Sequence, residues 1–160
     1  MNIYKNYIEK NDVALINKTF LSNTFPWYFE SKQVETGKKD TLFFSHCFVD
    51  KGNINSHAMF LIEPILKKLN IKNLLNVRAN LCPKGPFYCS WHVDRFTENL
   101  SHKTAIFYVN TNNGATEFKN KKVKCEKNKI VIFDAKQKHK ALGQTDKNVR
   151  MVINFNYESK

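Results

Sequence analysis

The chain has 160 residues, of which 42% are hydrophobic and 13% aromatic, which fits one globular domain with an ordinary core. No apolar run approaches the ~18–20 residues that span a bilayer, and the N-terminus lacks an apolar leader, so we expect a cytoplasmic protein that does not enter a membrane. The formal net charge of +12 admits two explanations. It can indicate a nucleic-acid or acidic partner, or it can reflect A/T-rich coding, because only three of the 26 basic residues are arginines.

The first part of the chain predicts helices. Asp12 can cap a helix whose apolar residues recur at helical spacing. Residues 41–49 predict a strand. A second helix is expected to begin at Asn55 or Ser56, and Pro64 inside it should kink the helix or divide it in two.

The second part of the chain predicts short strands, rich in Val, Ile, Phe and Tyr and separated by Asn, Gly, Asp and Lys. The turn Asn112-Asn113-Gly114 indicates a hairpin between two of them. The candidate strands are residues 73–82, 87–92, 103–110, 115–119, 122–126, 129–134, 137–142 and 149–157.

Two helices followed by about eight short strands predict a mainly β fold. We expect a jelly roll, or double-stranded β-helix, with two or three helices packed on one sheet. The whole chain, 1–160, then forms a single domain, in which residues 1–72 give helical support and residues 73–158 form the jelly-roll core. The four cysteines include no C-x-x-C pair, which argues against a structural zinc site and favours free thiols.

The sequence His92-Val93-Asp94 is the first candidate for chemistry. Residues i and i+2 of a strand project to one face, so this imidazole and this carboxylate can approach one metal ion. Such a pair alone arises readily by chance, but His139 follows on a strand that a jelly roll can return beside the first. Two histidines and one aspartate on one face of an octahedron suit iron(II), because three positions stay open.

Arg150 follows His139 after one short turn and should begin the next strand, facing the same interior. A buried guanidinium needs an anion, and a carboxylate is its natural bidentate partner. The 5-carboxylate of 2-oxoglutarate is an anion of that kind.

With these residues in view, the chain resembles the iron(II)/2-oxoglutarate dioxygenases. It is most similar to their prolyl 4-hydroxylase-like branch, and within it to small oxygenases encoded by bacteriophages. Besides the H-x-D…H…R set, the segments that carry the resemblance are Leu21–Tyr28, Arg78–Pro83, Lys103–Asn110, Asn113–Phe118 and Lys129–Asp134.

The resemblance implies iron(II), 2-oxoglutarate and O₂ as cofactor and co-substrates, with succinate and CO₂ as products. It assigns the metal to His92, Asp94 and His139, and the 5-carboxylate of 2-oxoglutarate to Arg150. Tyr108 matches a tyrosine that helps to bind this carboxylate, and Thr104 matches a pocket residue beside it. Asn80 matches an asparagine near the iron end of 2-oxoglutarate, whereas Cys82 stands where related chains often carry tyrosine.

The resemblance favours hydroxylation of a C–H bond in a protein or peptide, with a prolyl residue as the first choice. Arg95, Phe96 and Trp91, near the H-x-D motif, are expected to line the substrate entrance. Two alternatives stay open: oxidation of nucleic acid bases of the AlkB type, which the charge favours, and a non-catalytic binding module of the same fold. The protein is expected to be a monomer or homodimer, in the host cytoplasm if a phage encodes it.

Overall fold

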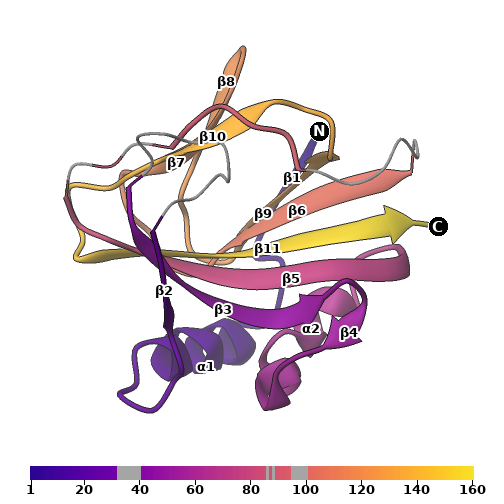
Figure 1. Ribbon diagram of the computed structural model, residues 1–160, viewed down its shortest axis with the longest axis horizontal. Helices are drawn as coiled ribbons and strands as arrows, with labels where there is room; N and C mark the ends of the chain where they lie inside the picture. Colours follow the sequence, from indigo (N-terminus) through magenta and orange to yellow (C-terminus); the bar gives the residue numbers. More distant parts are fainter. Residues whose placement is uncertain (32–40, 86, 88, 95–100) are drawn as a thin grey trace.

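Two antiparallel sheets face each other in the computed structural model, which describes residues 1–31, 41–85, 87, 89–94 and 101–160 (Figure 1). Within these residues the smaller sheet has three strands, in the order β10 (His139–Leu142), β7 (Ala115–Phe118) and β8 (Lys121–Lys124). The larger has eight. Its order is β1 (Asn2–Lys5), β9 (Lys129–Asp134), β6 (His102–Tyr108), β11 (Val149–Ser159), β5 (Ile71–Pro83), β3 (Phe43–Asp50) and β2 (Tyr28–Glu30), and β4 (Asn53–Ile54) pairs with β3.

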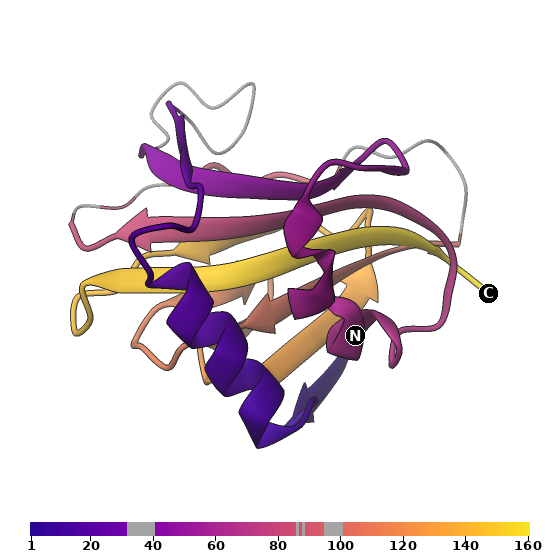
Figure 2. The same ribbon diagram turned by 90° about the horizontal axis from the view of Figure 1, so that it is seen from below.

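The helices cover the face of the large sheet that points away from the small one (Figure 2). They are α1 (Lys10–Phe20), the 3₁₀ helix η1 (His57–Leu61) and α2 (Glu63–Leu66). Val13 and Ile16 of α1 belong to one apolar core with Val77 of β5 and Ile153 of β11. The predicted jelly roll with two or three helices on one sheet is therefore confirmed.

The predicted helix boundaries are right in one case and wrong in the other. Glu9 occupies the N-cap of α1, so Asp12 lies in the first turn, where its charge still favours the helix dipole. Ser56 caps η1 by accepting the Ala58 N–H at 3.0 Å, and Pro64 lies in the first turn of α2. The proline thus divides the predicted helix in two, because its ring suits only a helix start.

The hairpin predicted at Asn112-Asn113-Gly114 is wrong. β6 before it belongs to the large sheet and β7 after it to the small sheet, so the segment crosses between the sheets. Asn113 explains the difference, because its side chain pairs with Thr145 in the β10–β11 connection at 2.7 and 2.8 Å. Residues 87–92 form no strand where they are described, except for a single bridge at His92.

The space between the sheets is apolar at one side and polar at the other. Phe118 and Val123 of the small sheet pack with Ile106, Val131 and Val152 of the large sheet. Further along β11 and β5, alternate residues turn polar groups to the same side. These residues are Arg150, Asn154 and Asn156 on β11, and Asn76, Arg78 and Asn80 on β5.

Candidate metal centre

The two predicted metal histidines lie side by side. The His92 N–H donates to the His139 carbonyl at 3.0 Å, and the His139 N–H donates back to His92 at 2.9 Å. Directly paired residues of antiparallel strands point to one side. Their imidazole centroids are accordingly 4.4 Å apart.

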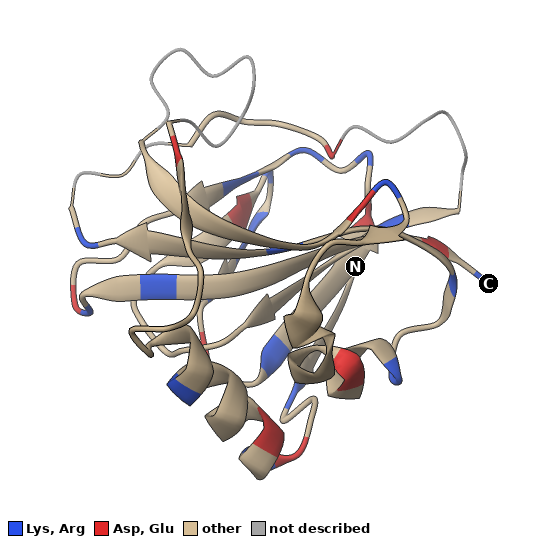
Figure 3. Ribbon diagram, turned by 60° about the horizontal axis from the view of Figure 1, so that its bottom comes forward, with Lys and Arg blue, Asp and Glu red and all other residues tan. Residues whose placement is uncertain are grey.

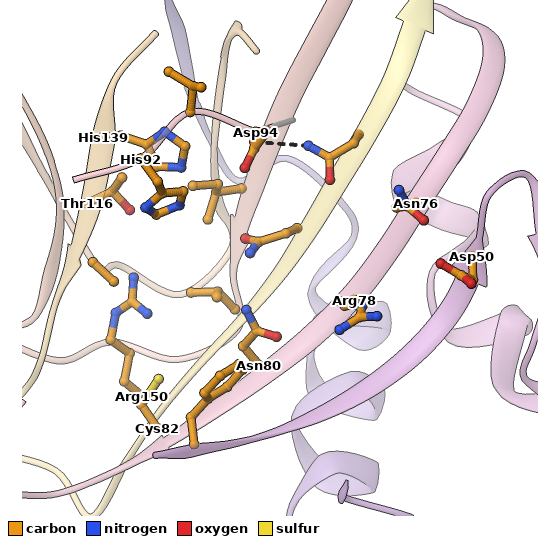
Figure 4. A pocket seen from close by; sticks show the side chains of 17 residues that line it. Asp50, Asn76, Arg78, Asn80, Cys82, His92, Asp94, Thr116, His139 and Arg150 are labelled. Carbon is orange, nitrogen blue, oxygen red and sulfur yellow. Dashed lines mark hydrogen bonds between the residues drawn. The ribbon is translucent and has the colours of Figure 1, made fainter. Parts of the chain in front are cut away.

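Asp94 completes the group. It follows His92 by two residues, and one ligand atom from each of His92, Asp94 and His139 lies within 4.8 Å of the others (Figure 4). The structure thus brings together the three residues that the sequence singles out.

Hydrogen bonds fix which nitrogen of each ring faces the group. The Nδ1 atom of His92 is 2.9 Å from the Ser90 carbonyl, and that of His139 is 3.1 Å from the Gln137 carbonyl. A carbonyl only accepts, so each Nδ1 carries the proton and each Nε2 has a free lone pair. This is how metal-binding histidines are held in proteins.

Burial lowers the pKa of the His139 imidazole, and the nearby His92 ring lowers it further, while the Asp94 carboxylate opposes the change. A neutral ring is the form that binds a metal ion. The site therefore favours the ligand form of His139 at neutral pH.

Two residues that are not candidate metal ligands hold the carboxylate of Asp94 by hydrogen bonds. Its Oδ2 atom accepts hydrogen bonds from the Thr104 hydroxyl and from Asn156 Nδ2, the latter at 3.0 Å. Thr104 was expected beside Tyr108, but the structure places it against Asp94. Asn156 was not among the residues predicted from the sequence. Strand alternation from Arg150 points to it, because a residue six positions further along faces the same side.

A cavity of about 540 Å³ joins these residues to the polar rows of β5 and β11 (Figure 4). That volume is in the range of small-molecule sites. Its lining includes all three candidate ligands, together with Asn76, Arg78, Asn80, Cys82, Thr116, Arg150, Asn154 and Asn156.

Arg150 closes the inner end of the cavity and is 2% exposed. Its Nε atom donates to Cys125 Sγ at 3.2 Å, and no carboxylate of the described residues pairs with its guanidinium. A buried cation is costly unless an anion accompanies it. Arg150 is therefore prepared to bind an anion that enters the cavity.

Tyr108 stands behind this end of the cavity rather than in its wall. Its hydroxyl donates to Thr116 Oγ1 at 2.8 Å, and Thr116 lines the cavity. Burial raises the pKa of Tyr108, although the Thr116 bond and the Arg150 charge oppose the rise. The phenol stays protonated, and it orients Thr116 toward the cavity.

Two amides in the cavity have unused hydrogen-bonding capacity. The Oδ1 atoms of Asn80 and Asn154 are buried and find no partner among the described residues. Buried polar atoms normally pair with protein, water or a ligand. Asn80 thus lies in the cavity, and Asn154 is a second such residue, which was not predicted from the sequence.

Trp91 lies outside the cavity, so its role at the substrate entrance stays a prediction. Trp91 is absent from the cavity lining, is 44% exposed, and lies 4.9 Å from Lys140 Nζ, measured to its ring centroid. Its neighbour His92 points into the site, and successive residues of an extended chain point to opposite sides. Arg95 and Phe96 lie outside the described residues.

No family model matches the chain, and no curated protein sequence matches it. Solved structures do match. A prolyl-4-hydroxylase from Pseudomonas putida has a TM-score of 0.63 at 13% identity, covering 99% of this chain and 92% of that one. A prolyl hydroxylase from Trichoplax adhaerens, in complex with a hypoxia inducible factor peptide fragment, has a TM-score of 0.67 at 11% identity, covering 99% and 83%.

A third match is an oxidoreductase of the 2OG-Fe(II) oxygenase family from Burkholderia pseudomallei. It has a TM-score of 0.68 at 10% identity, and the alignment covers 96% of this chain and 82% of that one. These likenesses show that the chain has the fold of the 2-oxoglutarate oxygenases.

Proposed function

We propose that the chain is an iron(II)- and 2-oxoglutarate-dependent dioxygenase that hydroxylates a C–H bond, with peptidyl proline as the first candidate substrate. One observation carries this proposal. The His92, Asp94 and His139 group shares a cavity with Arg150, a buried cation that no carboxylate of the described residues accompanies. A metal site next to an anion site is what a chelating keto acid requires.

The residues present fit the metal. Two neutral imidazoles and one carboxylate are the ligand set of non-haem iron(II) oxygenases. The bonds to Ser90 and Gln137 keep both Nε2 atoms free, and Asn156 with Thr104 leaves Asp94 Oδ1 for the ion. When bound, the iron would supply the activation of O₂ and the oxidative decarboxylation of 2-oxoglutarate.

The residues present also fit 2-oxoglutarate. Arg150 would bind its 5-carboxylate at the inner end of the cavity, beside the Thr116 hydroxyl that Tyr108 orients. Cys82, in place of a tyrosine, lines this end without a hydroxyl to offer. Asn80 would contact the part of 2-oxoglutarate nearer the metal, and its Oδ1 atom has no partner among the described residues.

A peptide substrate is supported by two of the structural neighbours, which are prolyl hydroxylases, one of them in complex with a peptide. The nucleic-acid alternative would gain support from a basic track leading to the metal. Among the described residues, however, no lysine lines the cavity. Figure 3 shows basic residues on helices, strands and loops alike, interspersed with acidic ones.

The test is coupled turnover. The protein with iron(II) and 2-oxoglutarate should release succinate faster when proline-containing peptides are added, and mass spectrometry should find one added oxygen atom on the peptide. Single-stranded oligonucleotides are the comparison. Oxidised bases with no peptide product would overturn the choice of substrate, and absence of succinate under all conditions would favour a binding module.

A further inference from the structure

Arg78 lies where the metal cavity meets a second hollow. It is on β5, with its Cα opposite Asn154 of β11, and it lines the 540 Å³ cavity. It also lines a hollow of about 310 Å³ with Tyr28, Glu30, Ser45 and Cys47. Among the described residues, Arg78 alone lines both, so the two hollows adjoin at Arg78; we call them together the groove.

The cavity opens in the direction of Arg78. Arg150 at the inner end is 2% exposed, whereas the Arg78 side chain is 48% exposed. Figure 4 shows Arg78, Asn76 and Asp50 on the side of the cavity away from Arg150. A substrate that reaches the metal from this open side passes Arg78.

The Arg78 guanidinium has N–H donors available for a further partner. Its ion pair with Glu30 runs through Nη1 at 3.6 Å, which is longer than a hydrogen bond. A guanidinium has five N–H donors in a planar fork that matches a carboxylate. Within the described residues, no other contact occupies Nη2 or Nε of Arg78.

We propose that Arg78 is a specificity-determining residue, which binds the carboxylate of an acidic side chain in an extended peptide substrate. The inference rests on the proposed oxygenase function and names the peptide class. The net charge of +12 would steer an acidic peptide toward the molecule.

The register of the strands sets the distance between the acidic residue and the reacting one. Asn156 touches Asp94, and Arg78 lies one strand over and two residues along from it. Neighbouring strands are ~4.8 Å apart and two residues along a strand span ~7 Å. The Cα atoms of Asn156 and Arg78 are therefore roughly 8 Å apart. An extended peptide rises ~3.3 Å per residue, so the acidic residue should be about two to four positions from the one hydroxylated.

The same groove disfavours a polyanion. Asp50 lines it beside Arg78, and Glu30 borders its outer hollow, so one exposed cation faces two carboxylates. A single carboxylate can use the free donors of Arg78. The evenly spaced phosphates of a nucleic acid would instead meet Asp50 and Glu30, and like charges at close range repel.

The experiment is a binding measurement that needs no turnover. The probes are fluorescent peptides with a central proline, carrying Asp, Asn or Lys in turn at each flanking position within four residues. They are titrated into protein loaded with manganese(II) and 2-oxoglutarate. The wild type should bind Asp over Asn at one or two positions by about tenfold, as expected for a charge-assisted contact that is half-exposed.

Three variants separate specificity from structure. Arg78→Gln should remove the preference for Asp, Arg78→Glu should shift it to Lys, and Glu30→Gln should strengthen it by freeing the guanidinium. Lys72→Gln is the matched control. Lys72 lies on the same strand, pairs with Glu158 at 2.9 Å, and is outside both hollows.

Two results would overturn the inference. One is equal binding of Asp, Asn and Lys peptides at every position. The other is an Arg78→Gln variant that weakens the binding of all three peptides alike. Succinate release by wild type, measured separately, distinguishes these failures from a failure of the oxygenase proposal itself.

Discussion

His92 and His139 are hydrogen-bonded to each other through both of their backbone N–H groups, at 3.0 and 2.9 Å. The contact joins the segment after β5 to the first residue of β10 in the small sheet, and it aligns the two imidazoles. Because main-chain atoms hold it, the side chains can be replaced without removing the bridge.

We therefore expect His92→Ala, Asp94→Ala and His139→Ala each to abolish metal binding and turnover while leaving the fold intact. Manganese(II) titration and thermal unfolding of the metal-free protein measure the two effects. His57→Gln, at the exposed first residue of η1, is the control that should retain full metal binding. Unchanged manganese affinity in the His139 variant would place the metal elsewhere.

Arg150→Ala should raise the dissociation constant of 2-oxoglutarate by about 30-fold or more. Losing one partner of a buried, charge-assisted contact costs about 2–5 kcal/mol. Arg150→Lys should recover part of the affinity, since an ammonium keeps the charge but not the planar fork. Calorimetric titration on manganese-loaded protein gives both values. If Arg150→Ala binds 2-oxoglutarate as wild type does, another residue holds the carboxylate.

Asn156 acts through Asp94 as a positioning residue. Asn156→Ala leaves Thr104 as the sole described donor to Asp94 Oδ2, and loss of such support typically weakens metal binding by about 10–100-fold. Asn154→Ala is the matched control, because Asn154 lies on the same face of β11 and is not among the described donors to Asp94. Equal manganese affinities in the two variants would refute the positioning role.

The sequence was informative where one local rule was enough. The i, i+2 rule for extended chain correctly put His92 and Asp94 on one side, and alternation along β11 turned Arg150 inward. The apolar strands predicted β9 with its observed bounds, Lys129–Asp134. Both results follow from residues that are close together in the chain.

The sequence misled where a distant partner decides the outcome. The Asn112–Gly114 segment has strong hairpin chemistry, yet Asn113 bonds to Thr145 and the chain changes sheets. Thr104 was expected beside Tyr108 and instead donates to Asp94. Neither contact leaves a periodic signal, because each joins two separate segments: Asn113 and Thr145 are 32 residues apart, and Thr104 and Asp94 are 10 residues apart.

The last prediction concerns Gly143, in the connection between β10 and β11. A Cβ at this position would stand 2.3 Å from Phe87 Cβ, well inside van der Waals contact. Gly143→Ala should therefore destabilise the fold by about 1–3 kcal/mol, as overpacking does, and disturb the spacing of His139 and Arg150. Chemical denaturation and 2-oxoglutarate titration measure the two effects.

A second substitution, at Phe87, tests whether the collision with Phe87 Cβ causes the loss of stability in Gly143→Ala. Phe87→Ala keeps the Cβ that would collide, so Gly143→Ala should cost nearly as much in that background as in wild type. Phe87→Gly removes the Cβ, so there the same substitution should cost clearly less. The difference between the two backgrounds is the coupling of a double-mutant cycle. If Gly143→Ala is equally costly in both, strain in the connection itself must be responsible, and the proposed steric conflict with Phe87 is wrong.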